Sequence, residues 1–220
     1  MNLEMSHQSQ IISNLSHVYW ARLMLTNIIN GHGYTTYKHT TGPVIWSPSY
    51  YVSVTDCSGY INALIKQSYL LDPLQWSGVA RPYASTYYKL ILEQRSFTKI
   101  TNIYSAKVGD FIVIRYLPGT TKTDNTGHIM LLNQLPIKIN NRPPSIRNTI
   151  QWAVDIIDQS SSHGANDSRY ATGKTGLGTG YLRIYTNVNG NLVGYSWSTG
   201  TGSKYVDHSV HPLVIGRLNL

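Results

Sequence analysis

The amino-acid sequence of 220 residues predicts an α+β fold in one domain. Two observations support this prediction. Segments with apolar residues at helical spacing dominate the first half of the chain, and short apolar runs bounded by glycine or polar turns fill the second half. No internal repeat or low-complexity tract interrupts this order, so helices should come first and an antiparallel sheet should follow.

The first predicted helix covers residues 9 to 30. Its apolar residues recur at intervals of three and four, and the pattern ends at Gly31 and Gly33. Residues 34 to 51 are rich in Thr, Tyr, Pro and Gly without a period. We therefore expect a loop or short irregular strands there, in a position to line a groove.

A second helix is expected from Cys57 to about Tyr69, with Thr55 or Asp56 as its cap, because apolar residues again recur at three and four. Residues 70 to 103 then read as an insertion that contains one more helical pattern.

Strands are expected from residue 109 onward. The candidates are residues 111–116, 129–132, 152–158, 182–185, 192–195 and 211–218. An Asn-Gly step at positions 189 and 190 predicts a hairpin between two of them. The last candidate would close the sheet.

The amino-acid composition limits the classes of binding partner that the protein is expected to have. Lys and Arg outnumber Asp and Glu by 18 to 10, which favours an anionic partner such as nucleic acid, a membrane surface or an acidic wall polymer. Charged residues are only 13% and tyrosines number 17, so hydroxyl-rich side chains must cover the surface. Such surfaces are common outside the cytoplasm, and we expect a periplasmic or secreted protein. No apolar run suits a membrane-spanning helix, and no signal peptide is visible at the start.

Cys57 is the sole cysteine, which excludes an internal disulfide and a multi-thiolate metal site. A helix N-terminus favours the thiolate form of a cysteine, so we expect Cys57 to be a nucleophile. His128, at the start of a strand, is the expected base. Asp158 is preferred over Asp155 and His163 as the third group, which holds the imidazole in its useful tautomer.

Three linked segments carry a family resemblance. They are Asp56-Cys57-Ser58-Gly59 before a helix, Gly109-Asp110 opening a strand, and Gly127-His128-Ile129 opening the next. In this order they resemble the NlpC/P60 family of cysteine peptidases. The resemblance covers residues 50 to 160.

The resemblance implies a papain-like core, with the nucleophile helix packed on an antiparallel sheet, and hydrolysis of amide bonds in peptidoglycan stem peptides. Cys57 would be the nucleophile and His128 the base. Asp158 occupies the third position, where the family more often has His, Asn or Gln, and Asp56 would help to hold a substrate amine. Residues 9 to 50 would form an N-terminal helical segment beside this core.

Residues 160 to 220 lie beyond the core that the resemblance covers, and we expect them to form a C-terminal β-hairpin extension. The polar segment 160–169, directly after the third predicted strand, is in a position to reach the cleft beside Cys57. Together with Ser58 beside the nucleophile, it supplies the expected substrate-binding residues His163, Asp167 and Arg169, and His163 is also an alternative catalytic group.

Two other function classes remain open: a cysteine amidase or acyltransferase acting on another amide, ester or thioester, and a non-catalytic wall- or glycan-binding module. We expect a monomer with a muropeptide substrate and no cofactor or metal. His208 and His211 lack a third ligand marked by spacing, and residues 172–175 lack the first glycine of a phosphate loop. Nucleic-acid binding is not expected, because no recognisable module is present.

Overall fold

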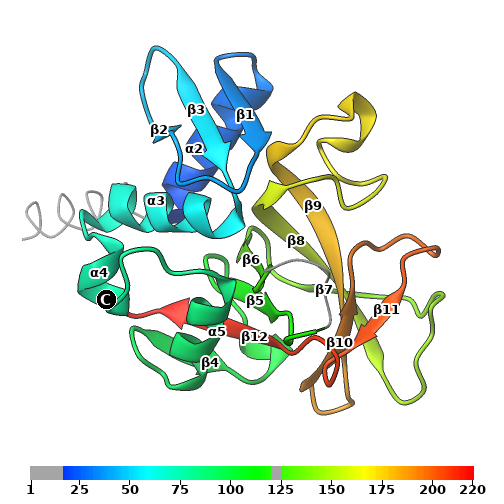
Figure 1. The fold of residues 1–220 in the computed structure, drawn as a ribbon. Helices are drawn as coiled ribbons and strands as arrows, with labels where there is room; N and C mark the ends of the chain where they lie inside the picture. The colour runs from blue at the N-terminus through cyan, green and yellow to red at the C-terminus, as the bar shows by residue number, and fades with distance from the viewer. Residues whose placement is uncertain (1–16, 120–124) are drawn as a thin grey trace, which may run out of the picture.

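A computed structural model of the protein describes residues 17–119 and 125–220. It shows the predicted α+β fold, with helices on one side of a large antiparallel sheet (Figure 1). The helices are α2 (His17–Ile29), α3 (Cys57–Tyr69), α4 (Pro73–Ser77) and α5 (Ala84–Leu92). The strands are β1 (Gly33–Tyr37), β2 (Val44–Ile45), β3 (Tyr51–Thr55), β4 (Phe97–Ile100), β5 (Phe111–Arg115), β6 (Gly127–Leu132), β7 (Ile137–Ile139), β8 (Ile150–Ser160), β9 (Gly176–Thr186), β10 (Leu192–Ser196), β11 (Tyr205–Asp207) and β12 (Leu213–Leu218). None of the described helices is long and apolar enough to cross a bilayer.

The N-terminal region is more regular than the sequence predicts. Residues 34 to 51 contribute to a small sheet of order β1-β3-β2, in which β1 runs parallel to β3. Helix α2 packs beside this sheet, and residues 9 to 16 of the predicted first helix lie outside the described residues. The small sheet matters for the site because β3 leads directly into α3.

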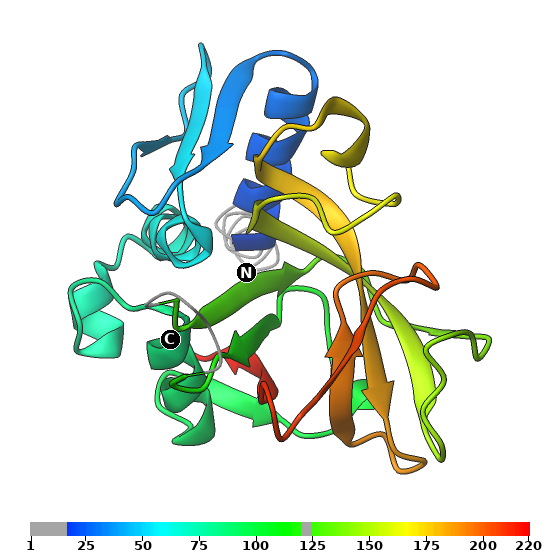
Figure 2. The same cartoon turned by 45° about the vertical axis from the view of Figure 1, so that its right-hand side comes forward.

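The large sheet has the order β11-β10-β9-β8-β6-β5-β12-β4, and β7 pairs with β8. Strands β8 and β9 pair along their whole lengths and reach the small sheet, where Thr35 Oγ1 accepts from Leu177 N at 2.7 Å (Figures 1 and 2). The predicted hairpin is confirmed, since Leu192 pairs with Thr186 across the turn.

The C-terminal residues, expected to form a β-hairpin extension of the core, share one continuous sheet with it. Strand β12 does not close the sheet but lies inside it, between β5 and β4. Leu213 and Ile215 pack on one face and Val214 on the other, so both faces of this strand are buried. Strands β9, β10 and β11 continue the same sheet outward from β8. Residues 160 to 220 are therefore part of the main sheet.

Alternation along the central strands places apolar side chains in two layers. Ile129 and Leu131 of β6 face the helices and share a buried cluster with Cys57 and Tyr60 of α3. Met130 and Leu132 point to the opposite face. The N-terminus of α3 is thereby fixed against the sheet.

Candidate active site

The N-terminus of α3 carries Cys57. Asp56 is the N-cap, and its Oδ1 accepts from Gly59 N at 2.7 Å and from Ser58 Oγ at 3.0 Å. A Cβ on Gly59 would collide with Thr55 Oγ1, which explains why glycine stands there. The free amide groups of this first turn favour negative charge beside Cys57.

His128, the second residue of β6, faces Cys57. Its Nε2 donates to Asp158 Oδ2 at 2.6 Å, which leaves Nδ1 free to interact with the nearby Cys57 side chain. Burial disfavours the charged imidazole, but the nearby Cys57 and the hydrogen bond to Asp158 outweigh burial and raise the pKa of His128 to about 10. These interactions therefore favour the charged imidazolium form of His128.

Asp158 lies at the far end of this series and is fully buried. Arg169, His163 and the hydrogen bond from His128 overcome its burial and hold the pKa of its carboxyl well below the usual range. Strands β6 and β8 pair through their backbones at Leu131 and Leu132, but this pairing does not extend to His128. At His128 the two strands are joined instead by the side-chain hydrogen bond to Asp158.

Asp155, the alternative third group, lies elsewhere. Its Oδ1 accepts from Asn133 Nδ2 at 3.1 Å, and burial raises the pKa of its carboxyl. No hydrogen bond joins it to His128 among the described residues. The structure thus brings Cys57 and His128 together with Asp158.

His163 also contacts Asp158. Its Nε2 lies 2.7 Å from Asp158 Oδ2, so one carboxylate oxygen serves two histidines. The His163 ring stacks on Trp197 with centroids 5.2 Å apart and an interplanar angle of 8°. This residue supports the carboxylate and does not line the cavity at Cys57.

Asp167 and Arg169 are not in the cleft where the sequence suggested them. Both are buried, and Arg169 donates from Nη2 to Asp158 Oδ1 at 2.8 Å and to Asp167 Oδ2 at 2.6 Å. Their loop folds back onto β9, where Ser168 N donates to Thr179 O at 2.9 Å. They stabilise Asp158 on the side away from His128. This placement depends on contacts between residues that are distant in the sequence.

His128, Asp158 and His163 could in principle hold a metal ion, since their ligand atoms lie within 4.8 Å of one another. The contacts of 2.6 and 2.7 Å match charge-assisted hydrogen bonds, whereas two ligands on one zinc ion would lie roughly 3.3 Å apart. Arg169 also neutralises the carboxylate. The donor set therefore fits a hydrogen-bonded network better than a metal centre.

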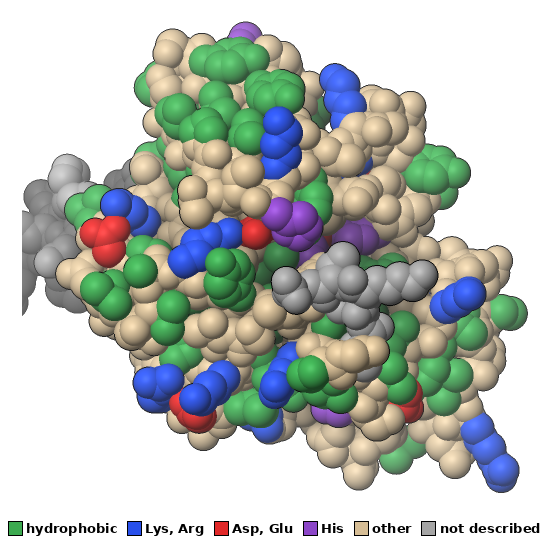
Figure 3. All heavy atoms as spheres, in the orientation of Figure 1, with side chains coloured by type: hydrophobic (Ala, Val, Ile, Leu, Met, Phe, Trp, Pro, Cys, Tyr) green, Lys and Arg blue, Asp and Glu red, His purple; other side chains and the backbone are tan. Residues whose placement is uncertain are grey.

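A cavity of about 580 Å³ opens in front of Cys57, on a face with few acidic side chains (Figure 3). It is lined by Tyr37, His39, Thr40, Thr41, Asp56, Cys57, Ser58, Arg81, Tyr83, Ala84, Asn125, Thr126 and Gly127. Gly127 has a φ of 140°, and a Cβ there would collide with Ile114 O. Glycine before His128 is thus a backbone requirement at the cavity edge.

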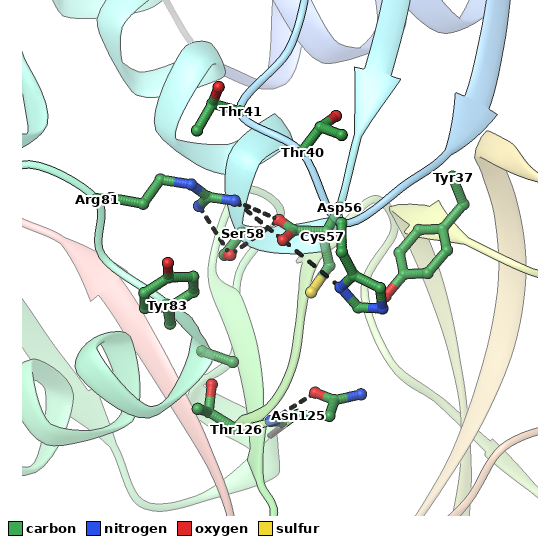
Figure 4. A pocket seen from close by; sticks show the side chains of 13 residues that line it. Tyr37, Thr40, Thr41, Asp56, Cys57, Ser58, Arg81, Tyr83, Asn125 and Thr126 are labelled. Atoms are coloured by element: carbon green, nitrogen blue, oxygen red, sulfur yellow. Dashed lines mark hydrogen bonds and ion pairs between the residues drawn. The ribbon is translucent and has the colours of Figure 1, made fainter. Parts of the chain in front are cut away.

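Arg81 is a site residue that sequence reasoning missed. Its Nη2 lies 2.8 Å from Asp56 Oδ1 and 2.9 Å from Oδ2, and Nη1 donates to Ser58 Oγ at 3.1 Å (Figure 4). A gap of 25 positions separates Arg81 from Asp56, so no local pattern could have linked them. Asp56 was expected to hold a substrate amine, but its carboxylate is already paired with Arg81.

Two tyrosines near the thiol were also missed. Burial and the charge at Cys57 raise the pKa of Tyr37 above its ordinary range and that of Tyr116 to about 12. Both phenols therefore remain protonated at neutral pH. Tyr37 lines the cavity, where a phenol can donate a hydrogen bond to developing negative charge.

Comparison with known proteins found no matching family model and no matching solved structure. A curated relative, the Uncharacterized protein R653 of Acanthamoeba polyphaga mimivirus, is 43% identical over 220 residues, which covers 93% of this chain and 97% of the relative. Because the similarity extends over nearly the whole of both proteins, the chain belongs to the same protein family as this mimivirus protein.

Proposed function

We propose that this protein is a cysteine hydrolase in which Cys57 is the nucleophile, His128 the proton carrier and Asp158 the group that orients His128. The observation that carries the proposal is the hydrogen bond from His128 to the buried Asp158, with Cys57 close enough to raise the pKa of His128, at the edge of a cavity large enough for a substrate. A buried cysteine that merely fills space requires none of these partners.

The proposed reaction has two stages. The Cys57 thiolate adds to a substrate carbonyl carbon and forms a tetrahedral oxyanion, for which the backbone amide at the start of α3 and the Tyr37 hydroxyl are the proposed hydrogen-bond donors. The oxyanion collapses and breaks the bond to the leaving amine, which takes the proton from His128 Nδ1. His128 then removes a proton from water, and the hydroxide adds to the thioester and displaces the Cys57 thiolate, which releases the acid and restores the thiolate beside the protonated His128.

The finer fold assignment is part of the same proposal. The helix that carries Cys57 packs on an antiparallel sheet, and neighbouring strands supply His128 and Asp158. This arrangement supports a papain-like core of the NlpC/P60 type. An aspartate in the third position serves the same purpose as the His, Asn or Gln more common in that family, because each can accept from the imidazole.

On this resemblance, the proposed substrates are amide bonds in bacterial cell-wall stem peptides. One observation favours a second candidate, a cysteine amidase or acyltransferase acting on a different acyl group. Arg81 pairs with both oxygens of Asp56, so the carboxylate expected to hold a stem-peptide amine is occupied. The chemistry at Cys57 would be the same for either substrate.

Mass spectrometry of peptidoglycan fragments and of a panel of amide, ester and thioester substrates, each incubated with purified protein, tests the proposal. We expect wild-type protein to convert at least one class, while Cys57→Ala and His128→Ala leave every substrate intact. Identical products from wild type and Cys57→Ala would overturn the assignment of Cys57 as nucleophile.

A further inference from the structure

We propose that Arg81 determines substrate charge: it makes the wall beside Cys57 unfavourable for a free amine and favourable for an uncharged or anionic group. This inference deepens the proposed function and rests on it only in taking Cys57 as the reacting group.

Both carboxylate oxygens of Asp56 already have partners. Its Oδ1 accepts from Gly59 N at 2.7 Å, Ser58 Oγ at 3.0 Å and Arg81 Nη2 at 2.8 Å, and its Oδ2 lies 2.9 Å from the same Nη2. The Asp56 side chain is only 9% exposed. A substrate ammonium could reach this carboxylate only by displacing Arg81, which would leave the guanidinium partly buried without its partner.

Arg81 is held firmly in place. It belongs to the segment between α4 and α5, and its guanidinium lies 5.0 Å from the centroid of the Tyr83 ring. Its Nη1 donates to Ser58 Oγ, and the adjacent Pro82 O accepts from Asn62 Nδ2 of α3 at 3.1 Å. The segment is thus tied to the nucleophile helix, so the charge at this wall is preorganised.

The wall of the cavity carries few other charged groups among its described residues. Among the described lining residues, Asp56 is the sole carboxylate and Arg81 the sole guanidinium or amine. His39 is the other titratable base, and its Nδ1 lies 3.9 Å from Asp56 Oδ2. With Asp56 neutralised by Arg81, no unpaired carboxylate faces the cavity among the lining residues that the structure describes. Repulsion of the wrong charge is a common source of specificity.

The experiment measures the electrostatic potential at Cys57 and does not require catalytic turnover of a substrate. Methanethiosulfonates with a sulfonatoethyl, a methyl or a trimethylammonioethyl group transfer that group to a thiolate as a mixed disulfide and release methanesulfinate. Intact mass gives the rate for each reagent, normalised to its rate with N-acetylcysteine amide. We expect wild type to react faster with the anionic than with the cationic reagent, and Arg81→Gln to lower this ratio at least fivefold.

Two further variants make the comparison decisive. Arg81→Lys keeps the positive charge and should keep a ratio within twofold of wild type. Arg95→Gln removes an arginine that pairs with Glu93 and does not line the cavity, and it should leave the ratio unchanged. If Arg81→Gln does not fold, the wild-type ratio decides alone, since faster labelling by the cationic reagent overturns the inference.

The two proposals fail in different ways. An unchanged ratio in folded Arg81→Gln, combined with Cys57-dependent hydrolysis, contradicts the role of Arg81 alone. A lowered ratio with no Cys57-dependent conversion of any substrate contradicts the proposed hydrolase.

Discussion

Arg169 Nη2 lies 2.8 Å from Asp158 Oδ1, the carboxylate oxygen that is not shared with a histidine. Both side chains are buried, and Arg169 also pairs with Asp167. One guanidinium therefore pairs with two buried carboxylates, while His128 and His163 bind the other oxygen of Asp158. Arg169 and His128 thus bind opposite oxygens of the same carboxylate.

Arg169→Met should destabilise the protein strongly, because it leaves Asp158 and Asp167 buried without their counterion. We expect the free energy of unfolding in urea to fall by about 3–5 kcal/mol. The exposed Arg95→Met is the matched control and should change it by no more than about 0.5 kcal/mol. Equal stability of the two variants would contradict the pairing described above.

Asp158→Asn should remove most of the activity while the fold persists. An amide at this position no longer favours the imidazolium and can bind the wrong tautomer of His128, which in serine triads costs roughly 10⁴-fold in kcat. Asp155→Asn on the same strand should leave kcat within about twofold, as it does not contact His128. Equal losses in both variants would refute Asp158 as the orienting group.

His163→Ala separates support of Asp158 from substrate binding. Loss of a hydrogen bond to a charged group should lower the free energy of unfolding by about 1.5–3 kcal/mol, with KM unchanged. Urea denaturation and steady-state kinetics measure both effects. A raised KM at wild-type stability would instead indicate that His163 contacts the substrate.

His128 should titrate far above an ordinary histidine. Its pKa of about 10 arises partly from Cys57, so Cys57→Ala should lower this pKa, as followed by the NMR shift of the ring Cε1 proton. Because the folded pKa is raised, the contribution of His128 to stability is full below about pH 6.5 and is lost as pH rises through 10. Titration near 6.5 in both proteins would exclude the ion pair.

Local sequence patterns were sufficient for the elements that carry Cys57, His128 and Asp158. The helical period after Cys57, the glycine before His128 and the strand that contains Asp158 each lie within a few neighbouring residues. Such patterns report which face of an element is buried and where it begins. The sequence therefore predicted correctly which helix or strand carries each of these three residues.

Features that depend on long-range contacts were not predictable. Arg81 meets Asp56 because α4 and α5 fold back on α3, and Arg169 turns inward because its loop packs on β9. Strand β12 pairs with β4 and β5 from the end of the chain. In each case the partner lies too far along the sequence for periodicity or turn signals to identify it.

The rate of Cys57 alkylation by iodoacetamide as a function of pH tests the central claim most directly, with intact mass as the readout. With the His128 imidazolium beside the thiolate, wild type should react at nearly the same rate at pH 6 and pH 8, while His128→Ala should slow sharply at pH 6. A wild-type rate that rises about tenfold with each pH unit over this range, as for an ordinary thiol, would contradict the account.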